Sequence, residues 1–199
     1  MACIQGMFQT RGICPLNECY AETTMMVFDV DGTLIGGEAA DWASFGGAFE
    51  EVAGFTLDPP FFARIEEITA QAIVHQALEN FPYPKRKQME TAVREAYLRR
   101  LKRAHELDPT SFPALEGTLA LLEELKQRGI RVAIATGDWF ETITFKLSAA
   151  GIPFDDIPMV TSSDLYSRAD IVTAAVAKAG GSLEEAVYIG DGLWDYRAC

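Results

Sequence analysis

The sequence MMVFDVDGTL, residues 25–34, joins a short apolar run to two aspartates and a glycine. Its first four residues, Met25–Phe28, begin abruptly after residues 1–24, which mix Cys, Gly, Pro, Asn and Gln without a helical or strand period. We predict an irregular tail over residues 1–24 and a buried core strand over Met25–Phe28. The two methionines at the strand also suggest the hypothesis that the tail is a non-native or loosely ordered extension.

The two aspartates after this strand have a spacing that suits catalysis. Residues two apart on an extended chain project in the same direction, so Asp29 and Asp31 can face one reaction centre while Val30 packs away from it. One carboxylate can attack phosphorus or hold a metal, and the other can deliver and recover a proton at the leaving group. Gly32 lets the chain turn sharply. A turn or helix-cap pair of aspartates is the alternative interpretation.

The rest of the chain divides into a helical block and an alternating block. Before about Asp108, long stretches with a helical period, such as Phe61–Leu78 and Lys85–Leu107, indicate an all-helical insertion. From Leu115 onward, helices alternate with apolar strands, which is typical of a doubly wound parallel sheet. The expected elements are helix Leu115–Arg128, strand Arg131–Ala135, helix Trp139–Ala150, a short strand near Met159, helix Ala169–Ala179 and strand Ala186–Ile189.

Length and composition agree with this organisation. The 199 residues, of which 49% are hydrophobic, can bury a core and fit one domain with a modest insertion. We therefore predict an α/β fold with a Rossmann-like core over residues 25–37 and 110–199, and an inserted all-helical domain over residues 38–109.

Two residues after the strand Arg131–Ala135 are candidates for binding phosphate. A hydroxyl and a glycine amide at a helix N-terminus form a site for phosphate oxygens that the helix dipole favours, and Thr136 and Gly137 supply both groups. Asp138 is interpreted differently. Because Glu141 follows it three residues later, Asp138 is predicted to be the N-cap of a capping box.

Further polar residues stand near the expected strand ends, which is where open α/β sheets bind ligands. Asp191 and Asp195 follow the strand Ala186–Ile189 and can supply oxygen ligands to Mg²⁺, although alone they could form a surface turn. Arg168 precedes a helix, where its fixed charge could pair with Asp29 and a phosphoryl oxygen. Taken alone, Arg168 would be interpreted as a solvated surface charge.

Charge and composition exclude several classes of function. The formal net charge of −12 opposes nucleic-acid binding, which depends on a basic surface. No apolar run approaches the roughly 18 to 20 residues that span a bilayer, so we expect a soluble protein without a membrane partner. The four cysteines lack metal-ligand spacing and no secretory signal is evident, so we expect free thiols, no zinc and a cytoplasmic location.

In combination, these features resemble the four signature motifs of the haloacid dehalogenase-like hydrolase superfamily. The hhhhDxDGT motif corresponds to Val27–Thr33, and the Ser or Thr of the second motif corresponds to Thr136. Arg168 stands where the third motif usually has Lys, and the GDxxxD motif matches Asp191 with Asp195. The resemblance covers about residues 25–199.

The resemblance implies a role for each matched residue. Asp29 would attack the phosphoryl group, and Asp31 would protonate the leaving oxygen and later activate water against the aspartyl-phosphate. Thr136 would bind a phosphoryl oxygen and Arg168 would stabilise its charge. Mg²⁺ would be held by Asp29, the backbone carbonyl of Asp31 and Asp191, with Asp195 bound directly or through a water.

The helical insertion resembles the cap of the phosphoglycolate phosphatase-like branch, which closes over small substrates. The implied function is Mg²⁺-dependent hydrolysis of a small phosphorylated metabolite, of unknown identity, by a protein of unknown oligomeric state. The presence of Asp31 argues against a dehalogenase, which lacks the second acid. A phosphomutase that uses the same nucleophile, Asp29, remains an alternative. A catalytically impaired member is another, because the core resembles one truncated after Asp195. Truncation would leave the strand Ala186–Ile189 as an unpaired sheet edge.

Other residues of the insertion are interpreted as structural. The basic residues at 85–87 and 94–103 are expected on a solvated helix face, with the pairs Glu90–Arg94 and Glu95–Arg99 at supporting spacing, rather than against an anionic substrate. His75 and His105 are interpreted as ordinary helical residues. Three aromatic residues are expected to pack in the core: Trp42, Phe45 and Phe49.

Overall fold

The computed structural model of the chain describes residues 2–5 and 24–199. Within these residues, five strands form an entirely parallel sheet in the order β1-β5-β2-β3-β4. Because the strands are parallel, the carboxyl ends of β2, β3 and β5 lie at one edge of the sheet. The strands are β1 (Ala2–Gln5), β2 (Met25–Phe28), β3 (Arg131–Ala135), β4 (Met159–Val160) and β5 (Ala186–Gly190).

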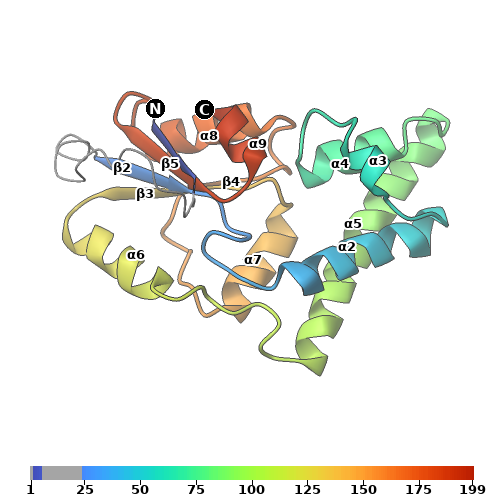
Figure 1. Cartoon of the computed structure of the whole chain (residues 1–199), viewed down its shortest axis with the longest axis horizontal. Coiled ribbons are helices and arrows are strands. Elements are labelled where there is room, and N and C mark those ends of the chain that lie inside the picture. Colours follow the sequence, from blue (N-terminus) through green and yellow to red (C-terminus); the bar gives the residue numbers. More distant parts are fainter. Residues whose placement is uncertain (1, 6–23) are drawn as a thin grey trace.

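Helices cover both faces of the sheet (Figure 1). α6 (Thr118–Gln127) and α7 (Phe140–Ala149) lie on one face, and α8 (Arg168–Lys178) and α9 (Leu193–Ala198) lie on the other. Alternating residues of each strand supply the two cores: Phe28 packs with side chains of α6 and α7, whereas Val27 packs with those of α8. The predicted doubly wound parallel sheet is confirmed.

The helical insertion lies beside the sheet and consists of α2 to α5 (Figure 1). We call it the cap. α2 packs against α5 through an aromatic cluster, in which the ring of Phe45 contacts those of Phe49 and Tyr97. Trp42 differs from the expectation of a packed residue, because 45% of its surface stays exposed. The helices of the cap are α2 (Glu38–Ala53), α3 (Pro59–Phe62), α4 (Ala70–Ala77) and α5 (Tyr83–Leu107).

The stretch Phe61–Leu78, predicted to be continuously helical, is instead split between α3 and α4 by a loop at residues 63–69. The Thr69 hydroxyl accepts a hydrogen bond from the amide of Ala72 and so caps α4. The amide of Ala70 donates to the backbone oxygen of Gly137 in the core at 2.7 Å. Contacts with the core, which a helical period does not encode, therefore fix this break.

The N-terminal prediction is wrong for residues 2–5. These residues form β1, which pairs in parallel with β5 in a register that places Ala2 opposite Val187. Because β5 also pairs with β2, the prediction that the strand Ala186–Ile189 is an unpaired edge is wrong as well. Residues 1 and 6–23 of the predicted tail lie outside the described part of the chain, and the hypothesis of a non-native extension rests on them.

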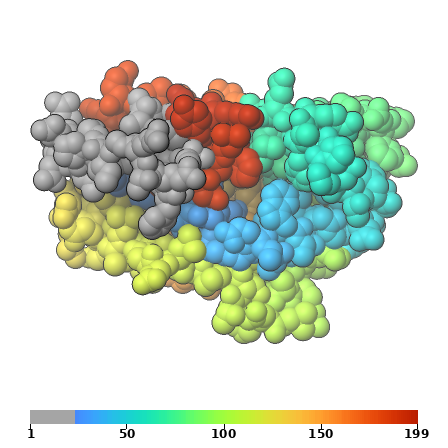
Figure 2. Space-filling view, in the orientation of Figure 1, coloured from blue at the N-terminus to red at the C-terminus, as the bar shows by residue number. Residues whose placement is uncertain are grey.

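The cap and the core touch through ion pairs and adjoining surfaces. Arg94 of α5 binds Glu141 of α7, and Asp41 of α2 binds Lys146 of α7. Arg99 binds Glu51 within the cap, so neither Arg94 nor Arg99 makes the predicted pair within α5. On the face drawn in Figure 2, the C-terminal segment in red lies directly beside the cyan segment of the cap. No helix in the described ranges is long and apolar enough to cross a membrane.

Replacing Leu147 tests the core between α7 and the sheet. This side chain is fully buried in the cluster that Phe28 joins. We expect Leu147→Ala to lower the free energy of unfolding by about 2 to 5 kcal/mol, because the removed methyl groups leave a cavity. Urea denaturation of the variant and the wild type measures the difference, and an unchanged midpoint would contradict this packing.

Candidate active site

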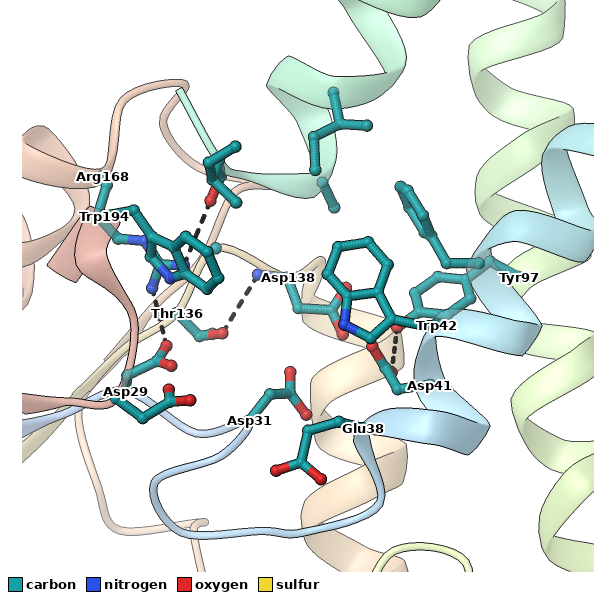
Figure 3. A pocket seen from close by; sticks show the side chains of 16 residues that line it. Asp29, Asp31, Glu38, Asp41, Trp42, Tyr97, Thr136, Asp138, Arg168 and Trp194 are labelled. Carbon is teal, nitrogen blue, oxygen red and sulfur yellow. Dashed lines mark hydrogen bonds and ion pairs between the residues drawn. The ribbon is translucent and has the colours of Figure 1, made fainter. Parts of the chain in front are cut away.

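The predicted site residues meet at the carboxyl edge of the sheet. Here a cavity of about 160 Å³ opens between the core and the cap. Figure 3 shows aspartates from the core facing aromatic and acidic side chains of the cap. Six predicted site residues line the cavity: Asp29, Asp31, Thr136, Gly137, Arg168 and Asp191. Asp195, the seventh, is fully buried beside it.

Asp29 lies at the end of β2 with only 4% of its surface exposed. The Arg168 guanidinium donates a hydrogen bond to Asp29 Oδ1 at 2.8 Å, as Figure 3 shows. Burial raises the pKa of Asp29 to about 7, despite the attraction of Arg168, and the nearby Asp195 adds to the rise. Asp29 is thus a poorly solvated carboxylate held in one orientation, which favours a nucleophile or a metal ligand.

Arg168 is held from several directions. It is 6% exposed at the start of α8, where its guanidinium lies 3.1 Å from Asp195 Oδ1 and donates to the backbone oxygen of Ile68 at 3.3 Å. The pKa of Arg168 rises because the attraction of Asp29 outweighs the effect of burial, so the group stays charged. The alternative of a solvated surface charge is therefore wrong. The Ile68 contact brings the cap loop at residues 63–69 into the site.

Three carboxylates are placed so that they could hold a metal ion. One oxygen each of Asp29, Asp191 and Asp195 lies within 4.8 Å of the others. Gly32 makes this possible, since a Cβ atom there would collide with the Asp191 carboxylate, and its φ of 78° is in the left-handed region. Hard oxygen ligands of this kind fit Mg²⁺. Asp191 and Asp195 therefore do not form a simple surface turn.

Asp195 also has a supporting role. Its Oδ2 accepts from the Gly192 amide at 2.9 Å, and its Oδ1 accepts from the Tyr188 hydroxyl at 2.8 Å. With the Arg168 contact, these bonds tie the loop after β5 to the start of α8.

Asp31 faces a different partner from Asp29. Its two oxygens accept hydrogen bonds from the ammonium of Lys146, both at 2.7 Å. Lys146 is fully buried on α7, and it also lies 2.8 Å from Asp41 of α2. Burial raises the pKa of Asp31 to about 8 and outweighs the attraction of Lys146. Sequence reasoning missed Lys146, because a lysine within a helix is normally solvated and no local pattern marks this one.

Asp138 belongs to the same cluster and is not the predicted N-cap. Trp139 occupies the N-cap of α7 without a side-chain cap, and Glu141 binds Arg94. Asp138 instead lies 2.9 Å from Lys146 and accepts from the Thr142 hydroxyl at 2.7 Å. The capping-box prediction is therefore wrong, because α7 begins after Trp139 and Asp138 Oδ1 accepts from the Trp139 amide instead of an amide further along the helix.

Thr136 and Gly137 stand between the two groups of carboxylates. The Thr136 hydroxyl accepts from the Asp138 amide at 3.2 Å, as drawn in Figure 3. A Cβ atom at Gly137 would come within 2.7 Å of the Arg168 guanidinium and 3.0 Å of the Ile68 oxygen. A glycine therefore lets Arg168 and the cap loop approach this turn, where both Thr136 and Gly137 line the cavity.

Comparison with known proteins agrees with this arrangement. The haloacid dehalogenase-like hydrolase family matches residues 24–199. No curated protein matches the chain by sequence. Among solved structures, a hydrolase from Pseudomonas syringae has 24% identity and a TM-score of 0.70, over 88% of this chain and 80% of that one.

Two further structures share the fold and have helical caps. CbbY from Rhodobacter sphaeroides, solved in complex with phosphate, has 22% identity and a TM-score of 0.67, over 88% of this chain and 81% of its own. A predicted phosphoglycolate phosphatase from Haemophilus somnus has 17% identity and a TM-score of 0.59, over 89% of this chain and 80% of its own. The family match over nearly the whole chain and the shared fold lead to one conclusion: this chain belongs to the haloacid dehalogenase-like hydrolases.

Proposed function

We propose that the chain is a Mg²⁺-dependent phosphatase that hydrolyses a small phosphorylated metabolite through an aspartyl-phosphate on Asp29. One observation supports the proposal most directly: Asp29 and Asp31, although only two residues apart, have different surroundings. Asp29 binds Arg168 and lies beside the other carboxylates that could hold a metal, whereas Asp31, whose side chain is 31% exposed, binds the buried ammonium of Lys146. Divergent environments of this kind let one carboxyl act as a nucleophile and the other as an acid.

In the first step, a carboxylate oxygen of Asp29 attacks phosphorus and the bond from phosphorus to the leaving oxygen breaks. Arg168 keeps the Asp29 carboxylate oriented and stabilises negative charge on the phosphoryl oxygens. The hydroxyl of Thr136 and the amide of Gly137 are the proposed donors to those oxygens, because both residues line the cavity.

Asp31 supplies and recovers the proton. With a pKa of about 8, it is protonated at neutral pH and can donate to the leaving oxygen. In the second step it accepts a proton from the water that attacks the aspartyl-phosphate, which releases phosphate and restores Asp29.

Mg²⁺ is the proposed cofactor, held by Asp29, Asp191 and the backbone carbonyl of Asp31, with Asp195 supporting this set. Bound there, it would supply positive charge that lowers the repulsion between an anionic nucleophile and an anionic substrate.

The lining of the cavity indicates the kind of substrate. Among the described residues that line it, Arg168 is the only Lys or Arg, and the cap adds the carboxylates of Glu38 and Asp41 beside the ring of Trp42. A second phosphate would therefore meet negative charge. The small volume of about 160 Å³ favours a short organic group. The carboxylates of the cap favour a group that is neutral or positively charged. The phosphate and xylulose-1,5-bisphosphate bound in structures of CbbY support phosphorylated substrates for this fold.

Replacing the nucleophile tests the proposed function. We expect the purified chain to release inorganic phosphate from p-nitrophenyl phosphate in the presence of Mg²⁺. Asp29→Asn should abolish turnover, because the amide cannot form the aspartyl-phosphate, while circular dichroism shows that the fold is retained. Turnover by Asp29→Asn at the wild-type rate would contradict the assignment of the nucleophile.

Replacing Asp31 tests the acid. Phenol, with a pKa of about 10, is a poorer leaving group than p-nitrophenol and needs more help from a proton donor. We expect Asp31→Asn to lower kcat/KM for phenyl phosphate at least about 10-fold more than for p-nitrophenyl phosphate. Equal losses for the two esters would assign the proton donor to another residue.

The raised pKa values predict how pH and metal affect stability. Between about pH 4 and pH 8 the unfolded chain ionises Asp29 and Asp31 before the folded chain does, so their contribution to the free energy of unfolding falls as pH rises. Mg²⁺ competes with a proton at Asp29, and its stabilising effect should therefore be larger at about pH 8 than at about pH 6.

Urea denaturation with Mg²⁺ or with a chelator measures both effects. Asp191→Asn is the matched control. Mg²⁺ should no longer raise its free energy of unfolding, but without metal this free energy should still fall as pH rises. A gain from Mg²⁺ that is equal at both pH values would contradict a metal site built on Asp29.

A further inference from the structure

Lys146 is the most completely enclosed cation in the described part of the chain, with no exposed surface. Its ammonium lies 2.7 Å from both oxygens of Asp31, 2.8 Å from Asp41 Oδ1 and 2.9 Å from Asp138 Oδ2. An ammonium has three protons to donate, and here it donates to both oxygens of Asp31 and to Asp41, while Asp138 is an ion-pair partner. Although burial disfavours its charge, these carboxylates raise the pKa of Lys146 well above its usual value, so it stays charged.

The partners of Lys146 come from both parts of the molecule. Asp31 follows β2 and Asp138 follows β3, whereas Asp41 belongs to α2 of the cap. The hydroxyl of Tyr97, on α5, donates to Asp41 at 2.5 Å and lies 3.5 Å from the ammonium. The lysine is thus fixed by groups from two loops of the core and two helices of the cap, and its position does not depend on Asp31 alone.

A buried ion cluster of this kind is a weak source of stability, because the cost of removing charges from water offsets their attraction. The cluster does, however, hold its charged side chains in fixed orientations. A free aspartate rotates about two bonds, but the ammonium contacts both oxygens of Asp31 and so restricts both rotations. A catalytic group contributes most to the reaction rate when its neighbours hold it near the productive geometry.

We propose that Lys146 is a positioning residue that orients Asp31 for proton transfer to the leaving oxygen, and that Asp41 and Asp138 anchor Lys146 for this purpose. The inference rests on the proposed phosphatase function. Lys146 does not line the cavity, so it acts on the reaction through Asp31 and not on the substrate.

The test compares p-nitrophenyl phosphate with phenyl phosphate in Lys146→Met. The value of kcat/KM covers only the steps up to departure of the leaving group, where Asp31 acts as the acid. We expect kcat/KM of Lys146→Met to fall at least about 10-fold more for phenyl phosphate than for p-nitrophenyl phosphate, which is the pattern of a lost acid. KM should change less than kcat for both esters.

The control is Leu147→Ala, which changes the next residue on α7 and also perturbs a fully buried position. Its effect on the two esters should be equal, because loss of packing does not distinguish leaving groups. If Lys146→Met does not fold, combining it with Asp41→Asn and Asp138→Asn removes the charges that the ammonium balanced and leaves Asp31 in place. The same difference between the esters is then expected.

The outcomes separate the two proposals. Equal losses for both esters in a folded Lys146 variant overturn the inference and leave the phosphatase function intact, provided that Asp29→Asn and Asp31→Asn behave as expected. A difference between the esters in Leu147→Ala also overturns it, because the effect would then be general. If the wild-type chain hydrolyses neither ester, the proposed function is overturned and the inference falls with it.

Discussion

The concentration of negative charge at the carboxyl edge of the sheet constrains the whole site. Asp29, Asp138 and Asp195 lose almost all contact with water there, and a buried carboxylate must be balanced by a cation or take up a proton. Arg168 pairs with Asp29 and Asp195, whereas Lys146 pairs with Asp31, Asp41 and Asp138, so each cation faces more carboxylates than its single charge can balance and protons must offset the rest. The motif residues Asp29 and Asp31, although only two positions apart, are therefore drawn to different cations. This separation gives one short motif two chemically distinct acids.

The cap contributes to the site in two ways. Its helices supply Asp41 and Tyr97 to the surroundings of Lys146, and its loop at residues 63–69 reaches over the core. The backbone oxygen of Ile68 accepts from Arg168, and the Glu67 carboxylate accepts from the Arg168 amide at 3.1 Å. The residue that binds Asp29 is thus itself bound by the cap. Movement of the cap relative to the core would change the surroundings of both aspartates together.

Some of this arrangement follows from the sequence and some does not. The strands Met25–Phe28 and Arg131–Ala135 agree with their predicted bounds, because short buried runs between polar turns have few other ways to fold. The motif residues were also predictable, since the ends of parallel strands meet. Lys146 was not, because its partners come from distant segments and its own helix gives no sign of burial. The break between α3 and α4 and the strand β1 were missed for the same reason: pairing with distant backbone determines them.

The pairing of β1 with β5 has a consequence for how the chain reaches its fold. Ala2 lies opposite Val187, so a segment near the start of the described chain completes the sheet beside one of its last segments. Closing so long a loop costs more entropy than joining neighbouring segments, and contacts of large sequence separation slow folding. On the ribosome, β1 leaves the exit tunnel long before its partner is synthesised. The sheet around the loop that carries Asp191 is thus completed after synthesis of β5, when the helices of the cap have already emerged.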